Sequence, residues 1–189
     1  QARLTGDLPV PERIVVIGGG NVAMDIARTC ARLQMRRYGK VEIDLACLES
    51  LKEIPADLEE VVESQEEGVR LHPSWGPVDI LAEGDRVTGV AFKRCLSVFD
   101  ENKRFSPKFD ENERMILAAD WVIESIGQQW DLSYLPEELM SRLEMTPRRQ
   151  VKASDDGQTS IPWLFAGGDI VHGPDIIHGV ADGHAAARG

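Results

Sequence analysis

The sequence predicts an α/β protein in which a parallel sheet is joined to a three-stranded antiparallel meander and followed by a smaller C-terminal segment. Residues Ile14–Ile17 form a continuous β-branched run, which suits a parallel strand buried on both faces. A glycine-rich turn follows, and then a helical pattern from Asn21 to about Tyr38. A second apolar strand, Val41–Leu48, completes a strand–helix–strand unit, whose crossover we expect to be right-handed.

The next segments show helix and strand patterns in turn. Residues 57–67 are an acidic helical segment that Gly68 would end, because glycine readily adopts the left-handed position after a helix. The segment Asp100–Asn112 is polar and broken by Pro107, so we expect a protruding hairpin or loop. The expected strands are Val69–His72, then the meander strands Pro77–Ala82, Val87–Cys95 and Arg114–Ala118, and finally Trp121–Ile126, which Gly127 ends.

Size and charge limit the functions that the chain can have. Its 189 residues suffice for one core or a core with an appendage, and its formal net charge of −11 argues against nucleic acid as the main partner. No apolar run approaches the ~20 residues of a membrane span. The three cysteines form no C-x-x-C pair, which favours reduced thiols and a cytoplasmic location. The chain begins at Gln1 and ends at Gly189 inside a helical pattern, so we expect a piece of a longer protein.

The glycine turn has the spacing and setting of a dinucleotide-binding site. The pattern Gly18-x-Gly20-x-x-Ala23 lies between a predicted strand and a helix, the context that this weak motif requires. The first glycine permits a tight turn, the second lets backbone N–H groups approach a diphosphate, and the alanine lets helix and strand pack closely. A purely structural turn is the alternative. The candidate diphosphate-binding residues, next to the partial positive charge of the helix N-terminus, are Gly18, Gly19, Gly20, Asn21, Val22 and Ala23.

Glu49 follows the second strand, at the position that normally faces the adenosine ribose. A carboxylate accepts hydrogen bonds from both ribose hydroxyls but repels a 2′-phosphate. Two like charges ~4 Å apart cost about 4 kcal/mol at a surface-like dielectric, before salt screening. The sequence therefore favours NAD(H) over NADP(H). The spacing from Gly20 exceeds the usual ~20 residues because the helix and its exit are long, and an ordinary surface glutamate is the alternative.

Five blocks of the chain carry a family resemblance. They are "VVIGGGNVAMDIARTCARL", "CLESLKEIPA", "EEGVRLHPSWGP", "DWVIESIGQ" and "TSIPWLFAGGDIVHGPDIIHGVADGHAAA". In this order they resemble the FAD-dependent pyridine nucleotide oxidoreductases of the glutamate synthase small-subunit type. In that family an NAD(P)-binding domain interrupts an FAD-binding domain. The resemblance implies that residues 1–130 are a Rossmann-like NAD(P)-binding domain and that 131–189 are the incomplete C-terminal segment of the FAD domain.

The same resemblance implies further site residues. Gly127 matches the family's A-x-G turn beside the nicotinamide nucleotide. Gly168 and Asp169 match the AGGD turn, whose aspartate typically binds the ribityl chain of the flavin. The helix that starts near Asp175 and Ile176 would point its N-terminus at the flavin ring and stabilise negative charge there.

The chain departs from the family pattern in two respects. Many relatives place an arginine pair, suited to a 2′-phosphate, where this chain has Leu48 and Glu49, which agrees with a preference for NAD(H). The family's first FAD turn and its upstream iron–sulfur cysteine segment are missing. We therefore expect FAD only in the full-length protein, and we expect the fragment alone to be inactive.

The function implied by the resemblance is hydride transfer between NAD(P)H and flavin, with an electron-accepting subunit or an iron–sulfur protein as partner. This chemistry needs stacked rings rather than a side-chain nucleophile, so no catalytic residue is assigned. The absence of C-x-x-C argues against the thioredoxin-reductase branch. No metal site is expected, because His172, His178 and His184 lack the i, i+4 spacing of helical ligands. An NAD-dependent dehydrogenase acting without flavin and a noncatalytic nucleotide-binding module remain alternatives.

Two charged stretches have simpler interpretations. Arg28, Arg32 and Arg36 form an i, i+4 stripe well past the helix N-terminus, so a solvated outer face is favoured over an anion site. The acidic residues of the segment 57–67 are likewise expected to form a solvated face.

Overall fold

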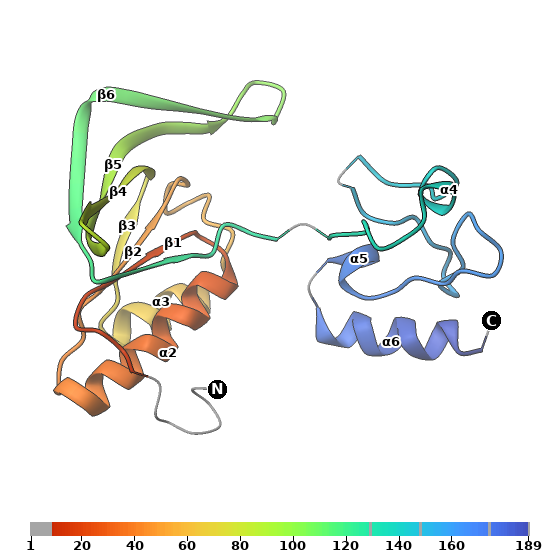
Figure 1. The fold of residues 1–189 in the computed structure, drawn as a ribbon, viewed down its shortest axis with the longest axis horizontal. Helices are drawn as coiled ribbons and strands as arrows, with labels where there is room; N and C mark the ends of the chain where they lie inside the picture. Colours follow the sequence, from red (N-terminus) through yellow and green to blue (C-terminus); the bar gives the residue numbers. More distant parts are fainter. Residues whose placement is uncertain (1–8, 129, 148, 174, 189) are drawn as a thin grey trace. The chain divides into compact units, whose positions relative to one another are not determined.

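The computed structural model describes residues 9–128, 130–147, 149–173 and 175–188, which belong to two compact units, residues 1–127 and 128–189 (Figure 1). The division after residue 127 falls three residues before the expected one, after residue 130. Within the described ranges, no helix combines the length and the apolar character needed to cross a bilayer.

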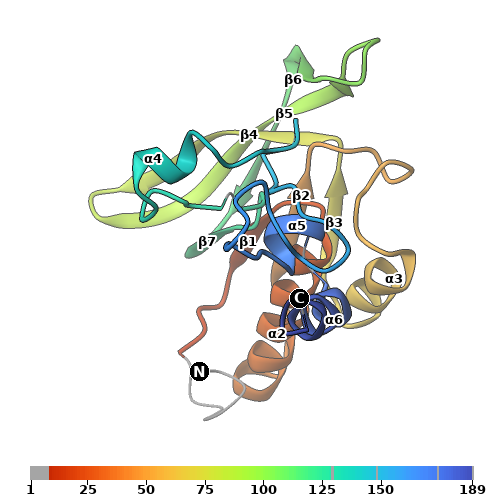
Figure 2. The ribbon, with the colours of Figure 1, turned by 90° about the vertical axis from the view of Figure 1, so that its right-hand side faces the viewer.

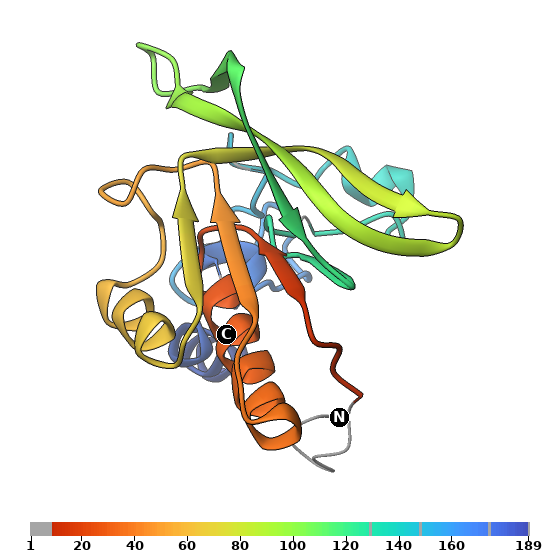
Figure 3. The ribbon, with the colours of Figure 1, turned by 90° about the vertical axis from the view of Figure 1, so that its left-hand side faces the viewer.

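A four-stranded parallel sheet forms the centre of the first unit and confirms the predicted fold class. Its strands are β1 (Ile14–Ile17), β2 (Ile43–Cys47), β3 (Arg70–Pro73) and β7 (Trp121–Glu124), in the order β3-β2-β1-β7. Figure 3 shows β2 and β3 side by side and pointing the same way. The strand order reverses at β1, so the carboxyl ends of β1 and β7 border a topological switch point, where open α/β sheets bind ligands.

Strand β1 is buried on both faces because its alternate residues belong to different cores. Ile14 and Val16 pack with the helices α2 (Asn21–Tyr38) and α3 (Leu58–Glu66). Val15 and Ile17 pack instead with the meander, whose largest buried side chain is a phenylalanine. In Figure 1 the two helices lie on one side of the parallel sheet and the meander on the other. This arrangement explains why the strand has no polar position.

The helix after the glycine turn has the predicted bounds. Helix α2 begins at Asn21 and ends before Gly39, which adopts a left-handed conformation with φ 68° and donates its N–H to the Met35 carbonyl at 3.0 Å. Helix α3 runs beside it (Figure 1, Figure 2) and is followed by Gly68 at φ 93°. Glycine therefore occupies the left-handed position after both helices, as the sequence predicted for the second.

The predicted meander consists of β4 (Trp75–Glu83), β5 (Arg86–Phe99) and β6 (Phe105–Ala118), paired in antiparallel order. The hairpin alternative for residues 100–112 is correct and the loop alternative is wrong. The turn is short because Asp100 Oδ1 accepts from the backbone N–H groups of Asn102 and Arg104, both at 2.8 Å. Pro107 is compatible with β6 because this strand lies at the sheet edge, where a missing N–H is tolerated.

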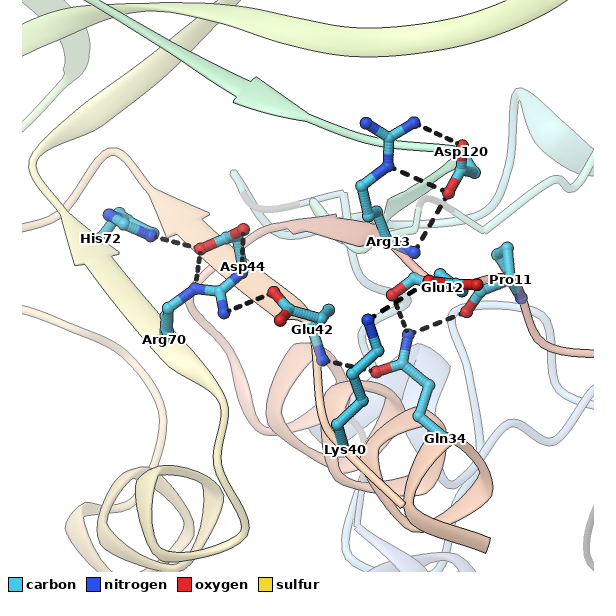
Figure 4. A network of polar contacts seen from close by, with 10 residues as sticks. All are labelled: Pro11, Glu12, Arg13, Gln34, Lys40, Glu42, Asp44, Arg70, His72 and Asp120. Carbon is cyan, nitrogen blue, oxygen red and sulfur yellow. Dashed lines mark hydrogen bonds and ion pairs between the residues drawn. The ribbon is translucent and has the colours of Figure 1, made fainter. Parts of the chain in front are cut away.

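Polar side chains hold together the segments that precede the parallel strands (Figure 4). The buried Gln34 side chain donates to the carbonyls of Pro11 and Glu12 at 2.9 and 3.0 Å and accepts from the Glu42 N–H at 2.8 Å. Arg13 pairs with Asp120, with Nη2 to Oδ1 at 2.7 Å. These contacts join the starts of β1, β2 and β7.

The second unit contains little regular structure. Its helices are α4 (Glu137–Met140), α5 (Asp169–His172) and α6 (Ile176–Ala186). Leu143, Val151 and Ile161 form its buried core, to which Ile170 of α5 adds a partly buried side chain. Helix α6 begins at Ile176, the start that the family resemblance implied.

Candidate nucleotide-binding site

Gly18 connects the end of β1 to the glycine turn and contacts the neighbouring strand exit. Its φ is 138°, a conformation that L side chains rarely adopt, and a Cβ at this position would overlap the Ser125 carbonyl. The Gly18 N–H donates to the Ala46 carbonyl at 2.9 Å, and the Ser125 N–H donates to the Ile17 carbonyl at 2.7 Å. Glycine at this position is therefore explained by the fold itself.

Gly20, the N-cap residue of α2, differs because no neighbouring atom of the described residues excludes a side chain there. Its φ of −89° and ψ of 171° are open to any residue, and nothing in the described residues lies within 4 Å of a Cβ added there. Gly20 precedes α2, whose first N–H groups have no partner within the helix and carry partial positive charge. The space above this glycine is thus open to an anion that approaches the backbone.

The rest of the turn has the burial expected of a helix packed on a strand. Ala23 is fully buried, whereas Val22 is 62% exposed. The Asn21 side chain forms a reciprocal pair with Asp57, donating to the Asp57 carboxylate and accepting from its N–H, both at 2.8 Å. The pair joins the N-termini of α2 and α3. This pair was not predicted, because no local sequence pattern relates residues 36 positions apart.

Glu49 lies beside the glycine turn, despite its long separation from Gly20 in sequence. A Cβ added at Gly19 would lie 3.1 Å from Glu49 Oε2 and 3.1 Å from the Cβ of Cys47. The Glu49 carbonyl accepts from the N–H of Ser74 at 2.8 Å. A carboxylate therefore lies next to the turn on the β2 side of β1. Burial raises the pKa of the Cys47 thiol to about 12, so this thiol adds no second negative charge there.

The opposite side of the turn, at the end of β7, contains the predicted Gly127. This glycine is exposed, has φ 94°, and has no described atom within 4 Å of an added Cβ. A cavity of about 400 Å³ lies between the ends of β1 and β7 and the strand β4. Its lining residues are Ile17, Pro77, Val78, Asp79, Ile80, Glu124 and Ile126. The wall that β4 contributes was not predicted from the sequence.

The charged faces of α2 and α3 pair with each other in part. The expectation of a solvated face holds for Arg36, Glu59 and Glu66, which are exposed, and is wrong for Arg28. The guanidinium of Arg28, whose side chain is 14% exposed, contacts Glu60, Glu63 and Glu67, and Arg32 also contacts Glu67. Hydrogen bonds from Arg32, and also from Arg28, lower the pKa of Glu67 against the opposing effect of burial. This part of the arginine stripe joins two helices.

In the second unit, Gly168 and Asp169 form the turn that leads into α5. Gly168 has φ 69°, and its N–H donates to Asp182 of α6 at 2.7 Å. A Cβ at Gly167 would lie 2.5 Å from the Asp182 Cβ. The turn therefore packs so closely against the helix that a side chain at Gly167 has no room. A cavity of about 220 Å³ lies between them, and the Asp169 side chain is exposed.

Asp175 has a structural role at the start of α6. Its carboxylate accepts from the N–H groups of Ile177 and His178 at 2.7 and 3.1 Å, and these hydrogen bonds lower its pKa. Ile176, the first residue of the helix, is 87% exposed. A role for Asp175 and Ile176 in cofactor binding stays a prediction.

Comparison with known proteins identifies the family. The pyridine nucleotide-disulphide oxidoreductase family matches residues 2–186. The chain belongs to this family. Membership supports binding of a pyridine nucleotide and of FAD, and it favours the expected oxidoreductase over the two alternatives, a dehydrogenase acting without flavin and a noncatalytic module.

Curated relatives confirm the resemblance to the glutamate synthase small chain. The beta subunit of NADP(+)-dependent formate dehydrogenase from Moorella thermoacetica is 37% identical, over 92% of this chain and 24% of the relative. The glutamate synthase [NADPH] small chain of Halomonas elongata is 33% identical, over 94% and 37%. The NAD-dependent dihydropyrimidine dehydrogenase subunit PreT of Escherichia coli K12 is 31% identical, over 97% and 37%. The chain thus spans 24% to 37% of the length of these relatives.

A solved structure shows the same fold. Thioredoxin reductase from T. acidophilum superimposes with a TM-score of 0.72 at 23% identity, over 93% of this chain and 50% of that protein. The predicted Rossmann-like architecture is confirmed. The expected preference for NAD(H) gains no support from the relatives, since two of the three are named for NADP(H).

Proposed function

We propose that the first unit binds the pyridine nucleotide of an FAD-dependent oxidoreductase, with the diphosphate against the turn from Gly18 to Ala23. The observation that carries this proposal is the contrast between two glycines. Gly18 is required by its close approach to Ser125, whereas Gly20 has open space above it and ordinary backbone angles. A structural turn accounts for the first glycine. The N-cap position of the second accepts other small polar residues equally well, whereas a diphosphate on the backbone requires that no side chain stand there.

We further propose that the adenosine half lies towards Glu49 and that NAD(H) is preferred. The carboxylate beside Gly19 supports this placement, because it can accept hydrogen bonds from both ribose hydroxyls and repels a 2′-phosphate. The relatives include enzymes named for either nucleotide, so the preference depends on Glu49 rather than on the family.

The second unit is proposed to form part of the FAD site of the whole protein. Its exposed Asp169 follows a glycine turn that packs closely against α6, and a cavity lies between this turn and the helix. When bound, FAD exchanges hydride with the nicotinamide. The relatives are named as subunits or chains, which supports an electron-accepting subunit or iron–sulfur protein as partner. Three buried cysteines without disulfides are consistent with a cytoplasmic location.

The experiment that tests nucleotide binding fills the open space above Gly20. The free energy of unfolding of the Gly20→Val variant should lie within about 1 kcal/mol of that of the original chain, since this is the usual cost of a poor helix cap. Its affinity for NADH, measured by isothermal titration calorimetry, should fall at least about tenfold, because the valine occupies the approach of the diphosphate. Met35→Val, an exposed change on the same helix, is the control. Undiminished affinity in a folded Gly20→Val chain would contradict the proposal.

A further inference from the structure

The strand order puts different strand ends on the two sides of β1. Strand β2, which leads to Glu49, pairs with one edge of β1, and β7, which ends at Glu124, pairs with the other. Ile17, the last residue of β1, lies opposite Glu124 in the register. If the diphosphate lies on the glycine turn and the adenosine towards Glu49, the second nucleoside extends towards the end of β7.

The cavity of about 400 Å³ lies on this second side. Its walls are largely aliphatic, with Ile17, Ile80 and Ile126 among the lining residues, and they also include two carboxylates, Asp79 and Glu124. The volume falls within the range of small-molecule sites, which combine apolar walls with a few polar groups.

An irregularity in β4 shapes one wall. The pairing of β4 with β5 shifts in register between Pro77 and Asp79, so Val78 has no partner and forms a bulge. Bulges re-aim side chains and are common next to active sites. Pro77, Val78 and Asp79 all line the cavity. The wall is thus a local departure from a regular strand.

We propose that this cavity receives the nicotinamide ring and that Asp79 and Glu124 make it bind the oxidised cofactor in preference to the reduced one. The inference rests on the proposed nucleotide-binding function. The oxidised ring is a flat cation and the reduced ring is uncharged, so carboxylates attract only the first. The aliphatic walls cannot solvate a cation and on their own favour the uncharged reduced ring, so a preference for the oxidised ring is assigned to the two carboxylates alone.

The preference affects the redox behaviour of the bound nucleotide. Any excess affinity for the oxidised form lowers the reduction potential of the bound pair, because binding and reduction are linked equilibria. The bound reduced nucleotide is then a stronger hydride donor than the free one. Both carboxylates are exposed, so the effect is screened by salt and is modest in size.

The test replaces both carboxylates by amides of nearly the same shape, in the variant Asp79→Asn/Glu124→Gln. The affinities of the chain for NAD+, NADH and ADP-ribose are measured by calorimetry at low salt. We expect NAD+ to bind about 3- to 10-fold more weakly to the variant, and NADH and ADP-ribose to change less than about twofold. Glu83→Gln, an exposed change at the end of β4 outside the lining, should change none of the three affinities.

The ADP-ribose measurement separates this inference from the proposed function. ADP-ribose lacks the nicotinamide ring but keeps the diphosphate and the adenosine. If it binds and the ratio of NAD+ to NADH affinity is the same in the variant, the assignment of Asp79 and Glu124 is wrong and the nucleotide site stands. If ADP-ribose fails to bind the unmodified chain, the proposed function is wrong and this inference with it.

Discussion

The Glu49 carboxylate lies beside the backbone of Gly19, with Oε2 3.1 Å from the place that a Cβ on this glycine would occupy. The two residues belong to different loops, one after β1 and the other after β2, and the parallel pairing of these strands brings their carboxyl ends together. A negative charge therefore lies at the edge of the proposed diphosphate site, on the side where we propose the adenosine ribose.

Replacing Glu49 should change which nucleotide binds. Glu49→Arg converts repulsion of a 2′-phosphate into attraction, so the ratio of NADPH to NADH affinity should rise at least about tenfold. Glu49→Gln should give a smaller rise, because it only removes the repulsion. Calorimetric titration with both nucleotides measures the ratio, with the exposed Glu53→Gln as the control. An unchanged ratio in Glu49→Arg would show that this side chain does not face the ribose.

Gly18→Ala should weaken the fold itself, in contrast to changes at Gly20. The added methyl group overlaps the Ser125 carbonyl, and the φ of 138° is strained for alanine. The free energy of unfolding should fall by about 2–4 kcal/mol, combining backbone strain with overpacking. Urea denaturation followed by circular dichroism measures it. Gly20→Ala should lower the free energy of unfolding by less than about 1 kcal/mol. Equal losses at Gly18 and Gly20 would contradict the conclusion that only Gly18 is required by packing.

Arg28→Met should loosen the contact between α2 and α3. The change leaves Glu60, Glu63 and Glu67 close together without their shared cation. We expect a loss of about 1–3 kcal/mol in unfolding free energy, because the Arg28 side chain is only 14% exposed. The loss should shrink in 1 M NaCl, which screens the repulsion among the carboxylates. Arg36→Met, on the exposed part of the same stripe, should change the free energy of unfolding by less than about 0.5 kcal/mol.

Asp44 should make stability depend on pH in the acid range. Although burial raises its pKa, hydrogen bonds from Arg70 and His72 outweigh burial and lower the pKa from 3.8 to about 2 (Figure 4). A depressed folded-state pKa gives stability that is present above about pH 4 and is lost as the pH falls through about 2. The contribution at neutral pH is about 2 kcal/mol.

The measurement is urea denaturation of the original chain and of Asp44→Asn between pH 2 and pH 6. The variant should be less stable at pH 6, and the difference should narrow towards pH 2, where the native aspartate is also neutral. A constant difference across this range would show that Asp44 does not titrate with folding.

The strand–helix–strand unit could be predicted because its signals are local. A β-branched run, a glycine turn and a 3.6-residue period each depend on neighbours in sequence, and β1 and α2 have the predicted bounds. The hairpin was harder to predict. Pro107 and the polar residues around it suggest a loop, and only the position of β6 at a sheet edge makes them compatible with a strand.

The site could be predicted only in part, for a similar reason. The glycine turn is a continuous motif, but the pairing of Asn21 with Asp57 depends on how two helices pack. The contact of Arg28 with three carboxylates also depends on how the two helices pack, because the arginine positions of α2 and the acidic positions of α3 do not indicate in sequence that they face each other. The alternation of apolar and polar residues does not reveal the bulge at Val78. The cavity wall formed by β4 could therefore not be predicted from the sequence.

Burial of β1 on both faces has a consequence for the ligand. Ile17 is held between neighbouring strands and packed under the meander, so the loop that follows it starts from an anchored point. Gly18 is hydrogen-bonded to β2 and packed against the exit of β7. A diphosphate that binds there contacts a preformed turn, so the entropic cost of ordering the chain on binding is small. The packing of the protein interior therefore fixes the shape of the surface that we propose as the nucleotide site.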